Sequence, residues 1–252
     1  MIIVRYAELA LKGKNRADFE KQLVRNIKDC MKKNRKSGDV KRIRGRILID
    51  TMYFPELAKV FGISSFSEAV EVNQDAEDIK KATLDHLKKG SFRVSVNRID
   101  KFPMSSMELE REIGALIVDK TGNDVDLKNF EWNLEIELIN GKAYVFNSRT
   151  EGPGGIPVGT QGKVLLIVED EDSIQAGMLA MKRGCMVHVQ KGGQHDISKL
   201  REYSYGYEVR EIDDCDIIVT GRRDLPSKRE YPGKLELHPL IGDGEPSKEI
   251  YR

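Results

Sequence analysis

The amino-acid sequence predicts a mixed α+β and α/β protein, in which two α+β modules precede one α/β module. Strand-like and helix-like segments alternate through the first 72 residues, which is typical of a small ferredoxin-like sandwich. The dipeptide Asn140-Gly141 separates two further strand-like segments and is a strong hairpin signal. The apolar segment 164–168 then runs directly into a helix that begins near Asp172-Ser173, as in α/β folds.

The first module is predicted to span residues 1–72. Residues 2–11 alternate well enough for a strand, and apolar residues at helical spacing predict a helix over 18–36. A strand over 47–49 follows the basic segment 42–46, then a helix over 54–61 and a closing strand over 69–72. This order predicts a βαβαβ run with one face of the sheet covered by helices.

The second module is predicted to span 73–150, with helices over 76–88 and 107–120 and strands over 92–96, 133–138 and 143–148. Ser105-Ser106 precedes the second helix, where a hydroxyl caps the first backbone N–H groups. The glycine- and proline-rich residues 151–162 predict an ordered linker.

The third module, residues 163–252, begins with the strand and helix that usually form a phosphate cradle. Its turn reads Glu169-Asp170-Glu171-Asp172. Four carboxylates repel phosphate, and no glycine allows close backbone approach, so the architecture of a nucleotide site lacks the residues of one. A helix over 174–183, a strand over 186–190 and a short helix over 198–203 follow.

Basic charge is concentrated in the first module. The whole chain carries a formal charge of +1, but residues 1–70 hold 16 Lys and Arg against 8 Asp and Glu. This asymmetry is typical of a nucleic-acid contact surface, although a solvated helix face produces part of it too. For each basic residue, the alternative to phosphate contact is an ordinary solvated surface charge. The candidate phosphate contacts are Lys12, Lys14, Arg16, Arg42, Arg44, Arg46, Arg98 and Lys101.

Three of these candidates, Arg42, Arg44 and Arg46, alternate into a strand, which predicts that they share one face. Lys12, Lys14 and Arg16 flank a glycine turn. Arg98 and Lys101 lie in the connector 97–103, where pairing with a neighbouring carboxylate is the alternative to RNA contact.

Several function classes are disfavoured by composition. No apolar run has the length of a membrane span, and the N-terminal segment lacks a cleavage site, so we expect a cytoplasmic protein with no membrane partner. Cys30, Cys185 and Cys215 form neither a CxxC motif nor a cysteine–histidine cluster, which disfavours disulfides and metal sites. The four histidines lack an acid or cysteine at useful spacing, and no catalytic residue is predicted.

Four segments resemble one protein family. In chain order they read RYAELALKGKNRADFEKQLVRNI, FGISSFSEAV, RIDKFPMSSMELEREIGALIVDK and GPGGIPVGTQGKVLLI. They are similar to the tRNA 4-thiouridine synthetases, the tRNA sulfurtransferases that also serve thiamine synthesis. The resemblance implies a ferredoxin-like domain, a THUMP RNA-binding domain and a PP-loop pyrophosphatase domain. It also implies binding of the tRNA acceptor end and a homodimer, and in the family a persulfide delivers sulfur to an adenylated uridine.

The chain departs from the family at the PP-loop. In the family this loop has the motif SGGxDS. When Asp172 and Ser173 are aligned with its last two residues, Val168, Glu169 and Asp170 replace the serine and the two glycines. Residues 216–221 and 238–242 resemble late segments of that domain, and about 90 residues remain where a full domain needs considerably more, so the strands and helices that normally lie between its early elements and these late segments are expected to be deleted. The expected third domain is a reduced, Rossmann-like one.

Together these features predict a tRNA-binding protein that is not an enzyme by itself and uses no cofactor. The first alternative is an active tRNA sulfurtransferase that binds ATP and magnesium by altered residues or completes its site with a partner subunit. A weaker alternative is a small-molecule sensor that uses the Rossmann-like domain.

Overall fold

The computed structural model describes residues 1–6, 16–193, 195–224, 226 and 228–241. The chain divides into two compact units, each assembled from separate segments. The first unit consists of Met1–Arg5, Gly38–Phe54 and Ser65–Thr150, and the second of Tyr6–Ser37, Pro55–Ser64 and Glu151–Arg252. Among the described residues, no helix is both long and apolar enough to cross a membrane.

The first unit contains an antiparallel sheet of order β2-β3-β1-β4-β9. Its strands are β1 (Ile2–Arg5), β2 (Val40–Ile43), β3 (Arg46–Ile49), β4 (Ser65–Glu68) and the short β9 (Thr150–Glu151). All four residues of β1 are buried, in keeping with a central strand that lies between β3 and β4.

The structure corrects two elements predicted for this region. Residues 40–49 form a hairpin of β2 and β3, whereas the sequence predicts one strand over 47–49 after the basic segment 42–46; Gly45 occupies the turn of the hairpin with a φ of 74°. The predicted strand 69–72 does not close the first sheet. Instead, β4 pairs with β1 in that sheet, and the chain passes at Ala69 into β5 (Val70–Asn73), which belongs to another sheet. The two strands abut, so sequence periodicity cannot separate them.

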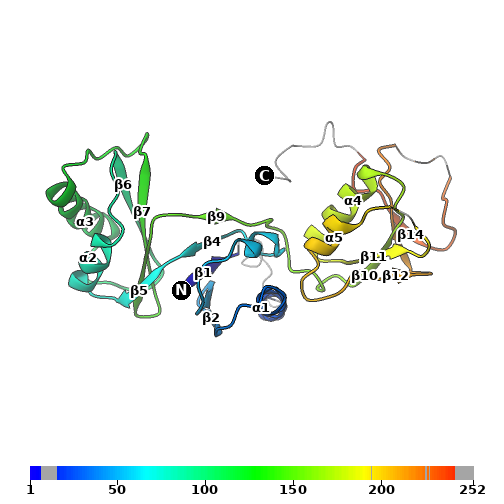
Figure 1. Ribbon diagram of the computed structural model, residues 1–252, viewed down its shortest axis with the longest axis horizontal. Coiled ribbons are helices and arrows are strands. Elements are labelled where there is room, and N and C mark those ends of the chain that lie inside the picture. Colours follow the sequence, from blue (N-terminus) through cyan, green and yellow to red (C-terminus); the bar gives the residue numbers. More distant parts are fainter. Residues whose placement is uncertain (7–15, 194, 225, 227, 242–252) are drawn as a thin grey trace. The chain divides into compact units, whose positions relative to one another are not determined.

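That second sheet of the first unit has the order β5-β8-β7-β6. It contains β6 (Phe92–Arg98), β7 (Trp132–Ile139) and β8 (Lys142–Phe146), and the helices α2 (Ala76–Leu84) and α3 (Ser106–Thr121) cover one face, as Figure 1 shows. The predicted hairpin is confirmed, because Asn140 and Gly141 have φ values of 56° and 74° between β7 and β8. The predicted cap is also confirmed, since Ser105 and Glu108 form a capping box.

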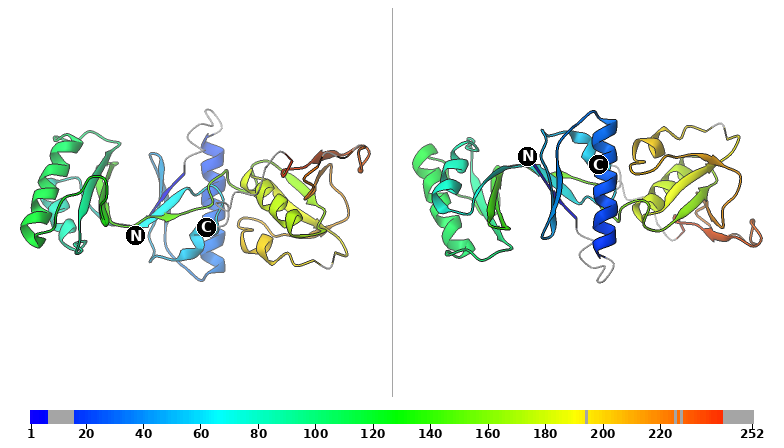
Figure 2. Two further views of the ribbon diagram at one scale, coloured as in Figure 1. Left: turned by 90° about the horizontal axis from the view of Figure 1, so that it is seen from above. Right: turned by 90° about the horizontal axis from the view of Figure 1, so that it is seen from below.

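The second unit combines helix α1 (Arg16–Lys33) and the 3₁₀ helix η3 (Pro55–Lys59) with the C-terminal α/β domain. Helix α1 is blue in Figure 2. The helix predicted over 54–61 is therefore a short 3₁₀ turn. The buried residues of α1 recur at helical spacing, as the sequence predicts; they are Leu23, Asn26, Ile27, Cys30 and Met31.

The C-terminal domain is built on a parallel sheet of order β12-β11-β10-β13-β14. Its strands are β10 (Lys163–Leu166), β11 (Met186–Gln190), β12 (Glu211–Ile212), β13 (Ile217–Val219) and β14 (Leu235–Leu237). Helices α4 (Glu171–Lys182) and α5 (Ser198–Glu202) accompany them (Figure 1). Strand β11 begins and ends where the sequence predicts, whereas β12 and β14 are too short for a periodic signal.

Candidate functional site

Arg16 is the one residue of the predicted 12–16 basic turn that lies within the described part of the chain; Lys12 and Lys14 lie outside it. Its guanidinium donates to Glu20 at 2.7 Å and lies 6.0 Å from the Tyr6 ring. Tyr6 also donates to Glu20, at 2.7 Å, and burial together with this bond raises the pKa of Tyr6 to about 12. Arg16 is thus fixed at the first turn of α1.

The β2–β3 hairpin separates the three arginines that the sequence places on one face. Arg42 lies opposite Ile47, and Arg46 lies opposite Ile43. Because paired residues share a face and neighbours alternate, Arg42 and Arg46 point to opposite faces. Arg44 lies in the turn between them. The predicted common face is therefore wrong, because a turn interrupts the alternation.

Arg46 instead joins a buried ion cluster. Its Nε donates to Glu137 Oε2 at 2.7 Å, and the Nε of Arg5 donates to Glu137 Oε1 at 2.6 Å. The Glu137 side chain is 1% exposed and the Arg5 side chain 6%. Arg5 also donates to Ser67 at 3.1 Å and lies 4.5 Å from the Phe146 ring centroid. Sequence reasoning missed this cluster, which fixes Arg46 as a structural cation.

The other basic candidates of the first unit that lie in loops, Arg44 and Lys101, are found on loops that meet at Asp100. Its carboxylate lies 3.9 Å from Arg44 and accepts the backbone N–H of Gly141 at 3.2 Å. The β2–β3 turn, the β7–β8 turn and the connector after β6 therefore meet at Asp100. Arg98 donates to the carbonyl of Met104 at 2.6 Å and so shapes that connector, while Lys101 is exposed on it.

Arg44 and Lys101 consequently expose cationic groups on neighbouring loops of one compact unit. Arg44 has a side chain that is 76% exposed, and Asp100, the carboxylate beside it, also accepts the backbone N–H of Gly141. Arg42 is also exposed, on β2. Such an arrangement of exposed cations on a loop frame held by hydrogen bonds suits contact with phosphate groups.

In the second unit, hydrogen bonds among its own residues hold the turn between β10 and α4. Asp170 is the N-cap of α4 and accepts the N–H of Ser173 at 2.8 Å. Ser173 Oγ in turn accepts the N–H groups of Glu169 and Asp170 at 3.2 Å and 3.4 Å. Three backbone donors at the start of this helix thus bond to side chains of the same turn.

Gly221 and Arg223, which follow β13, contact the same turn. The guanidinium of Arg223 binds Asp172 through two bonds, of 2.6 Å and 2.8 Å, and this contact lowers the pKa of the carboxyl group. A Cβ atom at Gly221 would lie 2.3 Å from the backbone nitrogen of Ser173. The chain after β13 therefore packs directly against the start of α4. Val168 precedes the turn and is half-buried.

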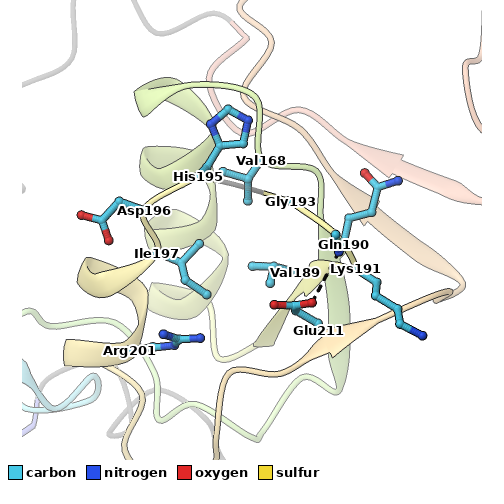
Figure 3. A pocket seen from close by; sticks show the side chains of 11 residues that line it. Val168, Val189, Gln190, Lys191, Gly193, His195, Asp196, Ile197, Arg201 and Glu211 are labelled. Atoms are coloured by element: carbon cyan, nitrogen blue, oxygen red, sulfur yellow. Dashed lines mark hydrogen bonds between the residues drawn. The ribbon is translucent and has the colours of Figure 1, made fainter.

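A pocket of about 360 Å³ lies at the carboxyl ends of β10 and β11. Figure 3 shows Val168, Val189 and Ile197 beside the polar side chains of Arg201 and Glu211. Ligands of open α/β sheets bind outside the carboxyl ends of the strands. The pocket therefore has the position of a small-molecule site; of its lining, the sequence analysis singled out Val168, as part of the altered nucleotide loop.

The cysteines and histidines form no reactive cluster among the described residues. Burial raises the pKa of Cys30 to about 12 and also raises that of Cys185, which disfavours thiolates. Cys215 is buried beside the carbonyl of Lys163. Thr220 lies 2.7 Å from Nδ1 of His238, but Thr220 is only 3% exposed, so this bond favours a structural role. No three His, Cys, Asp or Glu side chains of the described residues could hold a metal ion.

Comparison with known families assigns the first two modules. Residues 1–67 match the model of the ThiI ferredoxin-like domain, and residues 70–147 match the model of the THUMP domain. The fold therefore defines a THUMP-domain protein with an N-terminal ferredoxin-like domain. The chain belongs to the tRNA 4-thiouridine synthetase, or tRNA sulfurtransferase, family.

Individual relatives agree with this assignment. A probable tRNA sulfurtransferase of Natranaerobius thermophilus is 39% identical over 74% of this chain and 50% of its own length. The crystal structure of PH1313 from Pyrococcus horikoshii is 30% identical and superposes with a TM-score of 0.81 over 99% of this chain and 96% of that one. A 4-thiouridine synthetase in complex with RNA and ATP is 33% identical, with a TM-score of 0.67 over 82% of this chain and 59% of that one. The chain spans about half of the length of the first curated relatives it matches.

Proposed function

We propose that this chain binds tRNA at its acceptor end and does not bind ATP at the turn between β10 and α4. The observation that carries the RNA part is the THUMP match at 70–147, directly after the ferredoxin-like match at 1–67. The likeness to a 4-thiouridine synthetase crystallised with RNA supports the same partner. A tRNA partner implies a cytoplasmic location.

The loops around Asp100 are the proposed contact in the first unit. Arg44 and Lys101 are exposed there, and Arg42 lies on the adjacent strand. Asp100 and Arg98 hold the loops rather than the ligand, since both bond to backbone groups of the loop frame. Basic side chains on such a frame position an RNA backbone without reading its bases.

The ATP part of the proposal rests on how the β10–α4 turn is occupied. A triphosphate needs free backbone N–H groups at a helix start, yet those of Glu169, Asp170 and Ser173 already bond within the turn. Asp172 is engaged by Arg223, and Gly221 packs against the helix start. The residues present do not fit the nucleotide that the family's PP-loop binds.

Two alternatives keep a role for the C-terminal domain. Curated relatives are named probable tRNA sulfurtransferases, which favours an active enzyme that uses ATP and magnesium by other residues or with a partner subunit. The pocket beside Val168 favours a small-molecule module. Both require a ligand in the C-terminal domain, so measurement of ligand binding separates them from the proposal.

We expect the full chain to bind a tRNA transcript with a strong salt dependence. Each phosphate contact contributes a slope of about −0.7 to −0.9 in log K against log salt. The triple variant Arg42→Gln, Arg44→Gln, Lys101→Gln should therefore lower the magnitude of the slope by about 2 to 3. Fluorescence anisotropy at several salt concentrations measures the slope.

The matched control removes three cations from the C-terminal domain, by Lys191→Gln, Lys228→Gln and Arg229→Gln. It changes the net charge equally and should leave the slope close to that of the wild type. An acceptor-arm minihelix should compete as well as the whole tRNA. Equal losses in both variants would contradict the proposed contact, and competition by an unrelated hairpin would contradict acceptor-end recognition.

We expect no saturable heat when ATP and magnesium are titrated into the full chain at millimolar concentrations. The comparison variant Val168→Ser, Glu169→Gly, Asp170→Gly restores the family's loop pattern and removes two carboxylates, so it should bind ATP more tightly than the wild type. Calorimetry measures both proteins. Millimolar or tighter binding by the wild type that Asp172→Ala abolishes would contradict the proposal, as would tRNA-dependent release of pyrophosphate.

A further inference from the structure

Helix α1 presents a continuous basic stripe to solvent. Lys21, Arg25, Lys28 and Lys32 are all exposed and follow the spacing i, i+4, i+7 and i+11, which places them on one side of a helix. They lie opposite the buried face that contains Leu23, Asn26, Ile27, Cys30 and Met31. Eleven residues of helix rise by about 16 Å, along which one strand of a duplex places roughly five phosphates.

The cations of this stripe make few contacts within the protein. Lys21 pairs with Asp18 at 3.1 Å, but both side chains are more than half exposed, so this pair contributes little. Arg25 donates to Gln22 at 3.4 Å. Lys28 and Lys32 have no hydrogen-bond or ion-pair partner among the residues that the structure describes.

The other side of α1 is fixed to the C-terminal domain. Asn26 donates to the carbonyl of Val158 at 3.0 Å, and Lys33 donates to the carbonyl of Ser204 at 2.9 Å. Asp29 accepts the N–H of Gly206 at 2.9 Å. The stripe is therefore rigidly placed beside the segment 201–209, within one compact unit.

A groove of about 690 Å³ runs between α1 and that segment. Of its two carboxylates, Asp29 pairs with Lys33 at 3.0 Å, whereas Glu208 forms only a solvent-exposed pair with Arg210 at 3.3 Å. The remaining charged groups in its lining are the guanidinium groups of Arg25 and Arg201. The groove thus offers two cations next to the stripe, beside one solvent-exposed carboxylate, that of Glu208.

We propose that the α1 stripe and Arg201 form a phosphate-binding track for RNA, so that the second unit contributes its own part of the RNA interface. This inference rests on the proposed tRNA binding and adds a contact surface in which the C-terminal domain takes part. An RNA backbone fits better than a protein or a membrane surface. Among the described residues, none of the exposed large hydrophobic side chains lies on α1, whereas protein cores and lipid surfaces both require apolar contacts.

The test compares the full chain with a stripe variant, Lys21→Gln, Arg25→Gln, Lys28→Gln, Lys32→Gln, and with the single variant Arg201→Gln. Glutamine keeps helix propensity, so α1 should remain folded, which circular dichroism and the unfolding midpoint check. The control is Lys163→Gln, Lys191→Gln, Lys228→Gln, Arg229→Gln, which removes the same charge from exposed sites of the same unit.

Loss of four contacts should lower the magnitude of the salt slope for a tRNA transcript by about 3, so the affinity ratio of wild type to variant should fall about 60-fold between 50 and 200 mM salt. Arg201→Gln should lower the slope by about 0.7 to 0.9. A stripe variant that binds as the wild type does, or a control that loses as much, would overturn the inference and leave the tRNA proposal standing. A wild-type chain that does not bind tRNA would overturn both.

Discussion

Replacing Glu137 by Ala is expected to destabilise the protein by about 3–5 kcal/mol, because the substitution leaves two buried guanidinium groups without their shared carboxylate. Glu137 is 1% exposed and accepts from Arg5 at 2.6 Å and from Arg46 at 2.7 Å. The Nη2 atom of Arg5 is already buried without a hydrogen-bond partner among the described residues, so the loss of Glu137 would leave a second nitrogen of this guanidinium, Nε, without its acceptor. Urea unfolding of the full chain measures the loss.

Two further variants test whether the loss of stability comes from the buried charge of Glu137 rather than from any carboxylate–arginine pair on this strand. Glu135→Ala removes a carboxylate two residues away on the same strand, which pairs with the half-exposed Arg149, and should cost less than about 1 kcal/mol. Glu137→Gln keeps hydrogen-bond acceptance by one oxygen and should fall between the two alanine variants. Equal unfolding midpoints for Glu137→Ala and Glu135→Ala would show that the cluster does not stabilise the fold.

The same cluster predicts a pH dependence. Burial alone raises the pKa of Glu137, but Arg5 and Arg46 outweigh it, and the pKa lies below its ordinary value. A lowered folded-state pKa contributes stability that is complete above the unfolded value, near 4.3, and is lost as the pH falls through the folded value. The wild type should lose this contribution in acid, whereas Glu137→Ala should lack it at every pH.

Local signals in the sequence predicted local structure well. Asn140-Gly141 specifies a hairpin because both residues accept positive φ, and Ser105 specifies a helix start because its hydroxyl caps a free N–H. The β2–β3 hairpin was missed because Arg44-Gly45 lies within a run of alternating arginines that reads as a single strand. The period of a strand carries no information on where a turn reverses it.

The site depends on contacts that no local pattern reports. Asp100 meets Arg44 and Gly141, and Glu137 meets Arg5 and Arg46, across long stretches of sequence. In the sequence, Glu137 belongs to an alternation of polar and apolar residues that predicts a solvent-facing strand side. Its burial follows from the packing of two sheets in the first unit, which a single sequence does not specify.

At the acidic turn between β10 and α4, the sequence shows the residues, and only the structure shows their contacts. Glu169 and Asp170, which stand where the resembling family has the glycines of its nucleotide loop, are visible in the sequence. The bonds from their backbone to Ser173 and the bidentate contact of Arg223 with Asp172 are not, because Arg223 follows 51 residues later. The sequence therefore shows which residues form the turn, and the structure shows how these residues bond.

Phe61→Ala is expected to destabilise the second unit by about 3–5 kcal/mol, the usual cost of removing a buried aromatic side chain. Phe61 lies in the segment that matches the ferredoxin-like model, yet it is 4% exposed and packs in the core of the C-terminal domain. Its ring centroid lies 5.7 Å from that of Tyr203. The residue therefore links the N-terminal segment 55–64 to the C-terminal α/β domain.

Hydrogen exchange of the full-length variant locates the loss. Because Phe61 belongs to one hydrophobic cluster with Val164, Leu166 and Met181, amides of β10 and α4 should exchange faster in Phe61→Ala. Met52→Ala changes a side chain that is 79% exposed and should stay within about 0.5 kcal/mol of the wild type. If protection fell only in β1 to β4 and remained in β10 and α4, residues 1–67 would fold independently of the C-terminal domain, and the link through Phe61 would be wrong.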